Sequence, residues 1–224
     1  MKKILIFVAA LTLTLSVSAC STQKKPEENT LQANDIQSTQ ETEMQTIIEE
    51  DTQNTKEATS IALPAYEYQG DNPYVGAISE YMTIELTKDY DEEDVSIPSI
   101  IVVGEDDSDP KDIKVWGIFE IFNYDQNGET LECQSGGSYP GLMHISQDKS
   151  GKYTVTSFDI VEDRSAFDQS AEKIFGDYCD EFTKKYADDQ EKDDARKEFI
   201  KDYVDNNQLP ITQYKDFGWD PVKL

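Results

Sequence analysis

The sequence predicts an α+β domain: an N-terminal helix on a curved antiparallel sheet of four to five strands, followed by two C-terminal helices. Three observations support this class. Apolar residues recur at helical spacing over 72–88, β-branched and aromatic segments fill 99–161, and helical spacing returns over 165–204. The aromatic-rich stretch 63–224 has a length that suits one domain.

The first helix is expected from Asn72 to about Lys88. Asp71 or Asn72 is suited to cap its N-terminus, and Pro73 would occupy the first helical position, where its missing N–H costs nothing. One apolar stripe then follows at three- and four-residue spacing, formed by Val75, Ile78, Met82 and Leu86.

The middle of the chain reads as strands separated by turn residues. Asn127-Gly128 is a strong hairpin signal, and the glycines of Gly136–Gly141 are expected to interrupt the pairing at a bend. The run 113–124 is apolar on both faces, which indicates a strand covered on both sides. The expected strands are 99–105, 113–124, 129–134, 142–146 and 153–161.

The C-terminal third predicts helices. Ser165 and Asp168 have the spacing of a capping box, and an apolar stripe runs from Phe167 to Tyr186. A second helix is expected over about 189–204, and the tail 211–224, with Tyr214, Phe217 and Trp219, is expected to dock back onto the domain.

The N-terminus predicts export and lipidation. Two lysines precede the apolar run 4–17, which ends in small residues before Cys20 and is too short to span a membrane comfortably. This resembles the bacterial lipoprotein signal, which implies that residues 1–19 are a signal peptide and that Cys20 receives a diacylglyceryl group. The expected location is therefore the extracytoplasmic face of the cell membrane, held by lipid. An ordinary secretory signal with a chance cysteine is the alternative.

Residues 20–62 predict a disordered polar tether that carries the lipidated Cys20 at its start. The stretch is rich in Thr, Gln, Asn and Glu with almost no aromatic residues, so it cannot bury enough apolar surface to fold. Such a flexible chain spans roughly 35–40 Å. A long polar tether is typical of a cell-wall environment and thus indicates a Gram-positive producer.

Charge and composition exclude several classes of function. The formal net charge is −26, and residues 63–224 carry 37 acidic against 15 basic residues, a net charge of −22. Such a surface repels phosphate, so binding of nucleic acid through a basic face is excluded. One His and three Cys cannot build a structural zinc site, and no cofactor is predicted.

Three segments carry a resemblance to a known group: Ser135–His144, Tyr153–Asp159 and Ala171–Gly176. Over roughly 65–220 the chain resembles uncharacterised Gram-positive lipoproteins, whose fold is similar to the cystatin-like and nuclear-transport-factor-2-like superfamily. The resemblance implies a helix cupped in a curved antiparallel sheet, often with a pocket at the open end. It implies no activity, because the group has none assigned.

The single histidine is the candidate catalytic residue. Pairing across the turn after His144 would place Asp159 on the same face, and a His–carboxylate pair is a sound general base. Enzymes of the resembled superfamily often use His and Asp inside the cup. The alternative is a sheet histidine hydrogen-bonded for packing. Tyr139, Trp116 and His144 are also candidate ligand-binding residues.

An acidic loop offers a candidate calcium site, since hard cations take clustered oxygens. It lacks the Gly and Glu of a calcium-loop motif and contains Pro110, so a solvated loop is the alternative. Its acids are Asp106, Asp107, Asp109 and Asp112. Export permits a Cys133–Cys179 disulfide, although two free thiols among apolar neighbours are favoured.

Together these observations favour a non-enzymatic binding module for a small ligand, a peptide or a protein partner, tethered to the membrane through Cys20. A cup-shaped enzyme using a His144–carboxylate base is the second hypothesis. A purely structural envelope lipoprotein is the third. An exposed patch with Tyr139, Trp116 or Trp219 over a solid core would favour the first, and a deep pocket with His144 the second.

Overall fold

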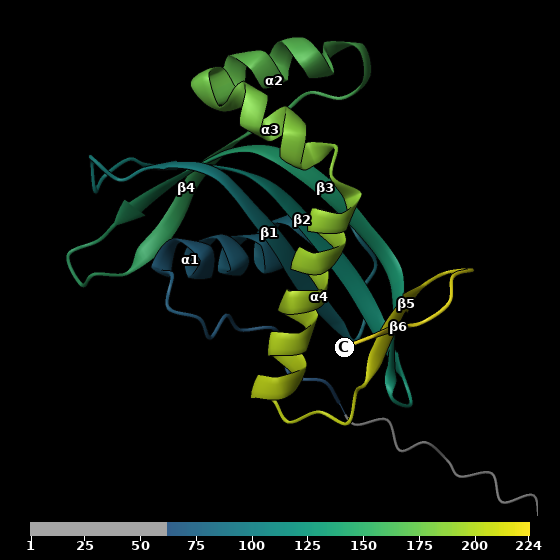
Figure 1. The fold of residues 1–224 in the computed structure, drawn as a ribbon. Helices are drawn as coiled ribbons and strands as arrows, with labels where there is room; N and C mark the ends of the chain where they lie inside the picture. The colour runs from purple at the N-terminus through teal and green to yellow at the C-terminus, as the bar shows by residue number, and fades with distance from the viewer. Residues whose placement is uncertain (1–61) are drawn as a thin grey trace, which may run out of the picture. The chain divides into compact units, whose positions relative to one another are not determined.

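The computed structural model describes residues 62–224, which all belong to one compact unit (Figure 1). The predicted signal peptide (1–19), Cys20 and nearly all of the tether (20–62) lie outside the described residues. In chain order the elements are α1 (Pro73–Tyr81), the π-helix η1 (Met82–Leu86), β1 (Val95–Asp106), β2 (Ile113–Asn127), β3 (Thr130–Gln147), β4 (Tyr153–Ile160), the 3₁₀ turn η2 (Arg164–Ala166), α2 (Phe167–Phe175), the 3₁₀ turn η3 (Gly176–Tyr178), α3 (Cys179–Tyr186), α4 (Asp189–Asn206), β5 (Gln213–Asp216) and β6 (Val222–Lys223).

The predicted α+β class with a curled sheet is confirmed. Within residues 62–224, six strands form one mixed sheet in the order β1-β2-β3-β5-β6, with β4 also paired to β3. The expectation of an antiparallel sheet is wrong at one place, because β5 pairs with β3 in parallel, from Thr130 opposite Gln213 to Cys133 opposite Asp216. The helices between β4 and β5 provide the long connection that a parallel pair requires.

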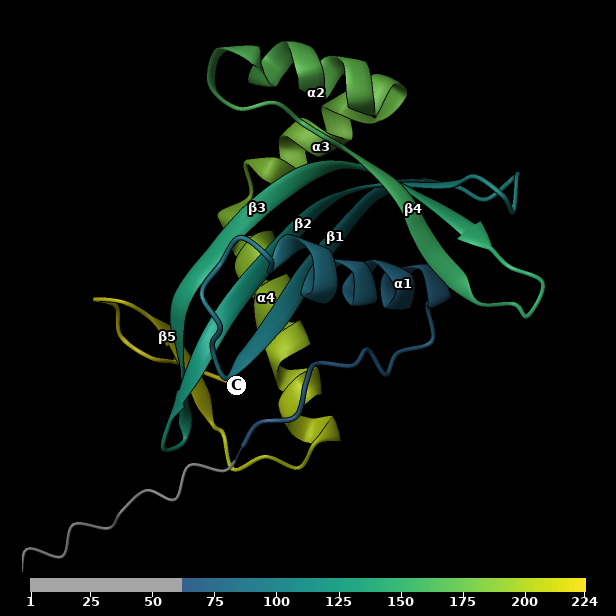
Figure 2. The ribbon, with the colours of Figure 1, turned by 180° about the vertical axis from the view of Figure 1, so that it is seen from behind.

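The two faces of the sheet are covered by different helices. The sheet curls around α1 on one face, and α4 crosses the opposite face (Figures 1 and 2). Phe119 and Ile121 of β2 pack with Ile78 of α1, whereas Ile118 packs with residues of α2 and α3. This alternation explains why β2 is apolar at both odd and even positions. None of the helices within residues 62–224 is both long enough and apolar enough to span a membrane.

The expected interruption of β3 by glycine is wrong. The ladder with β2 runs without a break through Gly136, Gly137 and Gly141, and one register shift falls just before them, at Asn123/Tyr124. The glycines serve close packing instead. A Cβ on Gly137 would lie 2.4 Å from the Tyr90 hydroxyl oxygen, and one on Gly141 would lie 2.2 Å from the Asp159 carbonyl oxygen.

The start of α1 follows the sequence closely. Asn72 Oδ1 accepts hydrogen bonds from the amides of Tyr74 (2.9 Å) and Val75 (3.2 Å), and Pro73 opens the helix. The helix widens to a π-helix at Met82, which is fully buried in the core. Thr83 Oγ1 donates to the Ser79 carbonyl oxygen (3.0 Å) in that turn.

The single helix expected over 165–186 is wrong. The polypeptide turns at Gly176, whose φ of 49° favours glycine, and two helices, α2 and α3, replace one. The Ser165–Asp168 capping box is also absent, because Ala166 stands at the N-cap without a side-chain hydrogen bond. The predicted start of the next helix is confirmed, since Asp188 Oδ1 caps α4 by accepting from the Glu191 amide (3.1 Å).

Arg196 of α4 joins the helix to the end of the chain. Its guanidinium makes two parallel hydrogen bonds to Asp216 (2.7 and 3.0 Å), and its Nε donates to the Tyr124 hydroxyl (2.8 Å). The group also lies 3.9 Å from the centre of the Phe122 ring. The Arg196 side chain is only 8% exposed, whereas the Asp216 side chain is 46% exposed, so the arginine is buried and its carboxylate partner is open to solvent.

Candidate functional site

The structure brings His144 and Asp159 together, as expected. Strand β4 pairs with β3 so that Ser157 lies opposite His144 and Asp159 opposite Leu142. His144 Nε2 is 3.6 Å from Asp159 Oδ2, beyond ordinary hydrogen-bond distance. The closer partner is Asp112, whose Oδ1 lies 2.6 Å from His144 Nδ1, and this bond lowers the pKa of the Asp112 carboxyl.

The surroundings of His144 engage both of its ring nitrogens with carboxylates. Each ring nitrogen faces a carboxylate, and Lys114 Nζ lies 3.3 Å from the second oxygen of Asp112. Asp159 lines a hollow between β4 and α2. His144 is not part of the lining of this hollow in the described part of the chain. A general base needs a substrate within hydrogen-bond reach of its free nitrogen, and here Asp159 occupies that direction.

The predicted calcium ligands do not converge. Asp106 Oδ1 accepts from the Ser108 amide (3.1 Å), Asp109 Oδ1 accepts from the Lys111 amide (2.9 Å), and Asp112 binds His144. The Ser108 hydrogen bonds lower the pKa of the Asp106 carboxyl. In the described part of the chain, 62–224, no three His, Cys, Asp or Glu side chains gather to hold a metal ion, and Asp107 joins no such group.

Two candidate ligand-binding aromatics have structural contacts instead. The Tyr139 hydroxyl lies 2.6 Å from the Tyr90 hydroxyl, which holds the loop before β1 onto the sheet. The Trp116 indole N–H donates to the Ile174 carbonyl oxygen (2.8 Å), and its ring lies 4.9 Å from that of Tyr178. Neither residue lines the cavity described below.

Cys133 and Cys179 are free thiols, as favoured by the sequence. They pack with different apolar clusters, Cys133 with that of α4 and β5 and Cys179 with that of α2 and α3. Burial raises the pKa of the Cys133 thiol to about 11, so this thiol is unreactive at neutral pH.

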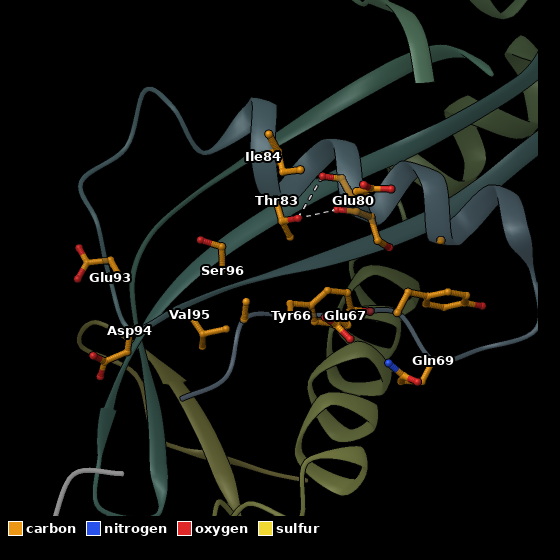
Figure 3. Close-up of a pocket in the computed structure, with 14 residues that line it drawn as sticks. Tyr66, Glu67, Gln69, Glu80, Thr83, Ile84, Glu93, Asp94, Val95 and Ser96 are labelled. Atoms are coloured by element: carbon orange, nitrogen blue, oxygen red, sulfur yellow. Dashed lines mark hydrogen bonds between the residues drawn. The ribbon is translucent and has the colours of Figure 1, made fainter. Parts of the chain in front are cut away.

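A cavity of about 680 Å³ opens between the segment Ala65–Gln69, α1 with η1, and the start of β1 (Figure 3). Tyr66 lies beneath the helix in that view and stacks on Tyr203 of α4, with ring centres 6.1 Å apart. The Tyr203 hydroxyl in turn donates to the Pro64 carbonyl oxygen (2.7 Å), which fixes the segment that forms this wall.

The described lining of this cavity is acidic and contains no basic side chain. Glu80 is partly neutralised by Lys152 (3.0 Å), and Asp94 Oδ2 accepts from the Gln126 amide (2.8 Å). Glu93 lies at one end; desolvation, followed by interaction with Asp125 and other nearby carboxylates, raises its pKa. Desolvation and the neighbouring carboxylates therefore both disfavour the ionised form of Glu93.

The same cavity holds a polar group without a partner. Ser79 lines it, is 1% exposed, and its Oγ has no hydrogen bond within residues 62–224. Burial raises the pKa of the Tyr66 hydroxyl, an effect that nearby Ser79 only partly offsets. A buried hydroxyl left unpaired costs free energy, so an added hydrogen-bond partner would be favourable at this place.

Sequence reasoning missed this cavity because its walls come from three separate segments. Residues 65–69 form no helix or strand, so neither spacing nor propensity marks them. The available signal was charge alone: Glu67, Glu93 and Asp94 lie in stretches that contain no basic residue nearby, but acids are common throughout this chain.

The C-terminal tail meets the expectation of docking only in part, and it exposes Trp219, one of the residues suggested for an exposed patch. The tail does dock back, with Tyr214 buried in β5, but Phe217 and Trp219 in the turn are 97% and 77% exposed. The turn is closed by a hydrogen bond from the Trp219 amide to the Asp216 carbonyl oxygen (3.1 Å). Two large aromatic side chains thus project from a fixed turn.

A comparison of the chain with protein-family models, with curated proteins and with solved structures found no match in any of the three.

Proposed function

We propose that the protein is a lipid-anchored extracytoplasmic binding module that holds a cationic ligand in the cavity of Figure 3. The observation that supports this most is the combination of four acidic side chains with a buried, unpartnered Ser79 hydroxyl around one open space. Its volume of about 680 Å³ falls in the range of small-molecule sites.

The chemistry of the lining favours an ammonium or guanidinium group. Carboxylates of Glu67 and Glu93 supply charge, and Tyr66 and Tyr68, which also line the cavity, offer aromatic rings that can stabilise a cation. A cationic ligand would also relieve the repulsion between Glu93 and its acidic neighbours.

Spermidine binding at low salt tests this site. We expect the double variant Glu67→Gln/Glu93→Gln to raise the Kd about tenfold, since two charge-assisted contacts near the surface together supply about 1.4 kcal/mol at low salt. Isothermal titration calorimetry measures the change.

The matched control removes two exposed acids on α2 and α3, Glu172→Gln/Asp180→Asn, and so changes the net charge equally. It should leave the Kd within about twofold, the change expected of distant surface charges. Equal weakening in both double variants would show that spermidine is attracted by overall charge rather than held in the cavity, and would refute the proposal.

The proposed anchor has its own test. In a bacterial host we expect Cys20→Ser to release the protein from the membrane fraction and to remove the mass of the acyl chains, because two chains provide stable anchoring. Mass spectrometry of the purified protein and fractionation of cells measure both effects. A variant that stays bound and unchanged in mass would refute lipidation at Cys20.

The finer fold is also a proposal. We assign the domain to the cystatin-like or nuclear-transport-factor-2-like type, because α1 lies inside the curl of the long strands β1 to β4. The parallel strand β5 and the helices after β4 are additions to that plan. The second functional hypothesis, an enzyme with His144 as base, has less support because both ring nitrogens face carboxylates.

A further inference from the structure

The exposed turn between β5 and β6 has the character of a membrane anchor. Phe217 and Trp219 flank Gly218, whose φ of 80° allows the tight turn, and Val222 beside them is 42% exposed. In Figure 1 the hairpin projects from the body of the domain at its C-terminal end. Trp is the side chain enriched at membrane–water interfaces, where its ring is buried and its N–H stays hydrated.

The turn is held rigidly from its base. Asp216, the residue before Phe217, is fixed by two hydrogen bonds from Arg196, and Lys215 pairs with Glu132 of β3 (2.9 Å). Tyr214 is buried against α4. The aromatic side chains are therefore presented without the entropy cost of ordering a loose loop on binding.

The size of the exposed surface favours a lipid surface over a protein. Two aromatic side chains offer roughly 300–500 Å², below the approximately 800 Å² per partner of a stable protein interface. Insertion into a bilayer needs no matching surface on a partner.

Local charge permits the approach. The domain carries −22 overall, yet the hairpin holds Lys215 and Lys223 against Asp220 and the Arg196-paired Asp216. This strip is electrically balanced, so an anionic bilayer repels it less than the rest of the domain.

The chain also enters the domain near this hairpin. Leu63, where the proposed tether ends, packs with the same apolar cluster as Tyr214 and Leu224. We propose that Phe217 and Trp219 insert into the interfacial region of the bilayer to which Cys20 is anchored; this rests on the lipid anchor of the proposed function. The tether makes the contact effectively intramolecular, which raises its occupancy without a new contact.

Tryptophan fluorescence of the mature lipidated chain in phosphatidylglycerol/phosphatidylcholine vesicles tests the proposal. Brominated acyl chains should quench the emission of Trp219. The emission maximum should also lie at a shorter wavelength than that of the Cys20→Ser protein, which carries no lipid, in buffer without detergent. Trp219→Phe provides the blank, because Trp116 packs against Tyr178 and remains as the other tryptophan. Phe217→Ser should lessen the quenching, whereas Ile160→Ser, at another exposed apolar residue, should not.

The outcomes separate the two proposals. Flotation of the protein with vesicles together with an acylated mass shows that the anchor is present, and unquenched Trp219 in that sample refutes insertion alone. Absence of the acyl mass refutes the anchor and, with it, the inference. A blue shift that grows with protein concentration in lipid-free buffer, together with no quenching by brominated lipid, indicates contact between copies and overturns insertion.

Discussion

Replacement of Arg196 by Ala is expected to lower the free energy of unfolding by about 2–3 kcal/mol, because a buried hydroxyl loses its donor and the packing of the buried guanidinium is lost. The change removes three hydrogen bonds at once and leaves the fully buried Tyr124 hydroxyl without a donor. It also removes the planar group stacked on Phe122. Urea unfolding followed by circular dichroism measures the loss.

Two further measurements make this prediction specific. Asp220→Ala, on the same hairpin but exposed, should change stability by less than about 0.5 kcal/mol. The hydrogen bonds from Arg196 lower the pKa of Asp216, so the stability they give is present above the unfolded pKa and is lost as pH falls through the folded pKa. The Arg196→Ala protein should lack that acid-sensitive contribution. Equal stability of Arg196→Ala and wild type would contradict a stabilising role for the Arg196–Asp216–Tyr124 contacts.

Replacement of Gly141 by Ala is expected to cost about 3 kcal/mol, at the upper end for overpacking a core. The added Cβ would lie 2.2 Å from the Asp159 carbonyl oxygen and 2.8 Å from the Phe158 ring. A carbonyl of a paired strand cannot swing aside, so β4 must move away from β3. Chemical denaturation measures the cost, and faster amide hydrogen exchange in β4 locates it.

The control is Thr154→Ala, an exposed position on the paired strand β4, which should stay within about 0.5 kcal/mol of wild type. If Gly141→Ala matched this control, the close approach of the two strands would not be a constraint on this position.

Local signals predicted much of the fold. The helix at Asn72 was identified from a cap, a proline and an apolar stripe, all of which act within a few residues. Asn127-Gly128 predicts the hairpin because such a turn requires a positive φ, which glycine tolerates, and Gly128 has a φ of 62°. Strands 113–124 and 153–161 were found within a few residues of β2 and β4 for the same reason: propensity and pairing agree there.

The remainder depends on contacts between distant residues. Strand β5 has only four residues, and its parallel partner lies 83 residues earlier in the chain, so spacing could not reveal it. From the sequence alone, the glycines of β3 predict an interruption of the strand. The structure shows why glycine is needed there: Tyr90 approaches Gly137, and Asp159 approaches Gly141, too closely for a side chain. For the candidate sites, His144 and Asp159 follow from hairpin register, whereas Asp112 reaches His144 from a loop.

The ion pair between Arg196 of α4 and Asp216 of β5 has a consequence for biosynthesis. A polypeptide emerges with its N-terminus first, so Arg196 exists before Asp216 does, and during that interval its guanidinium lacks a carboxylate partner. Only the final dozen residues complete the sheet. A prematurely terminated product therefore remains unfinished and open to quality-control proteases, although it contains nearly the whole sequence.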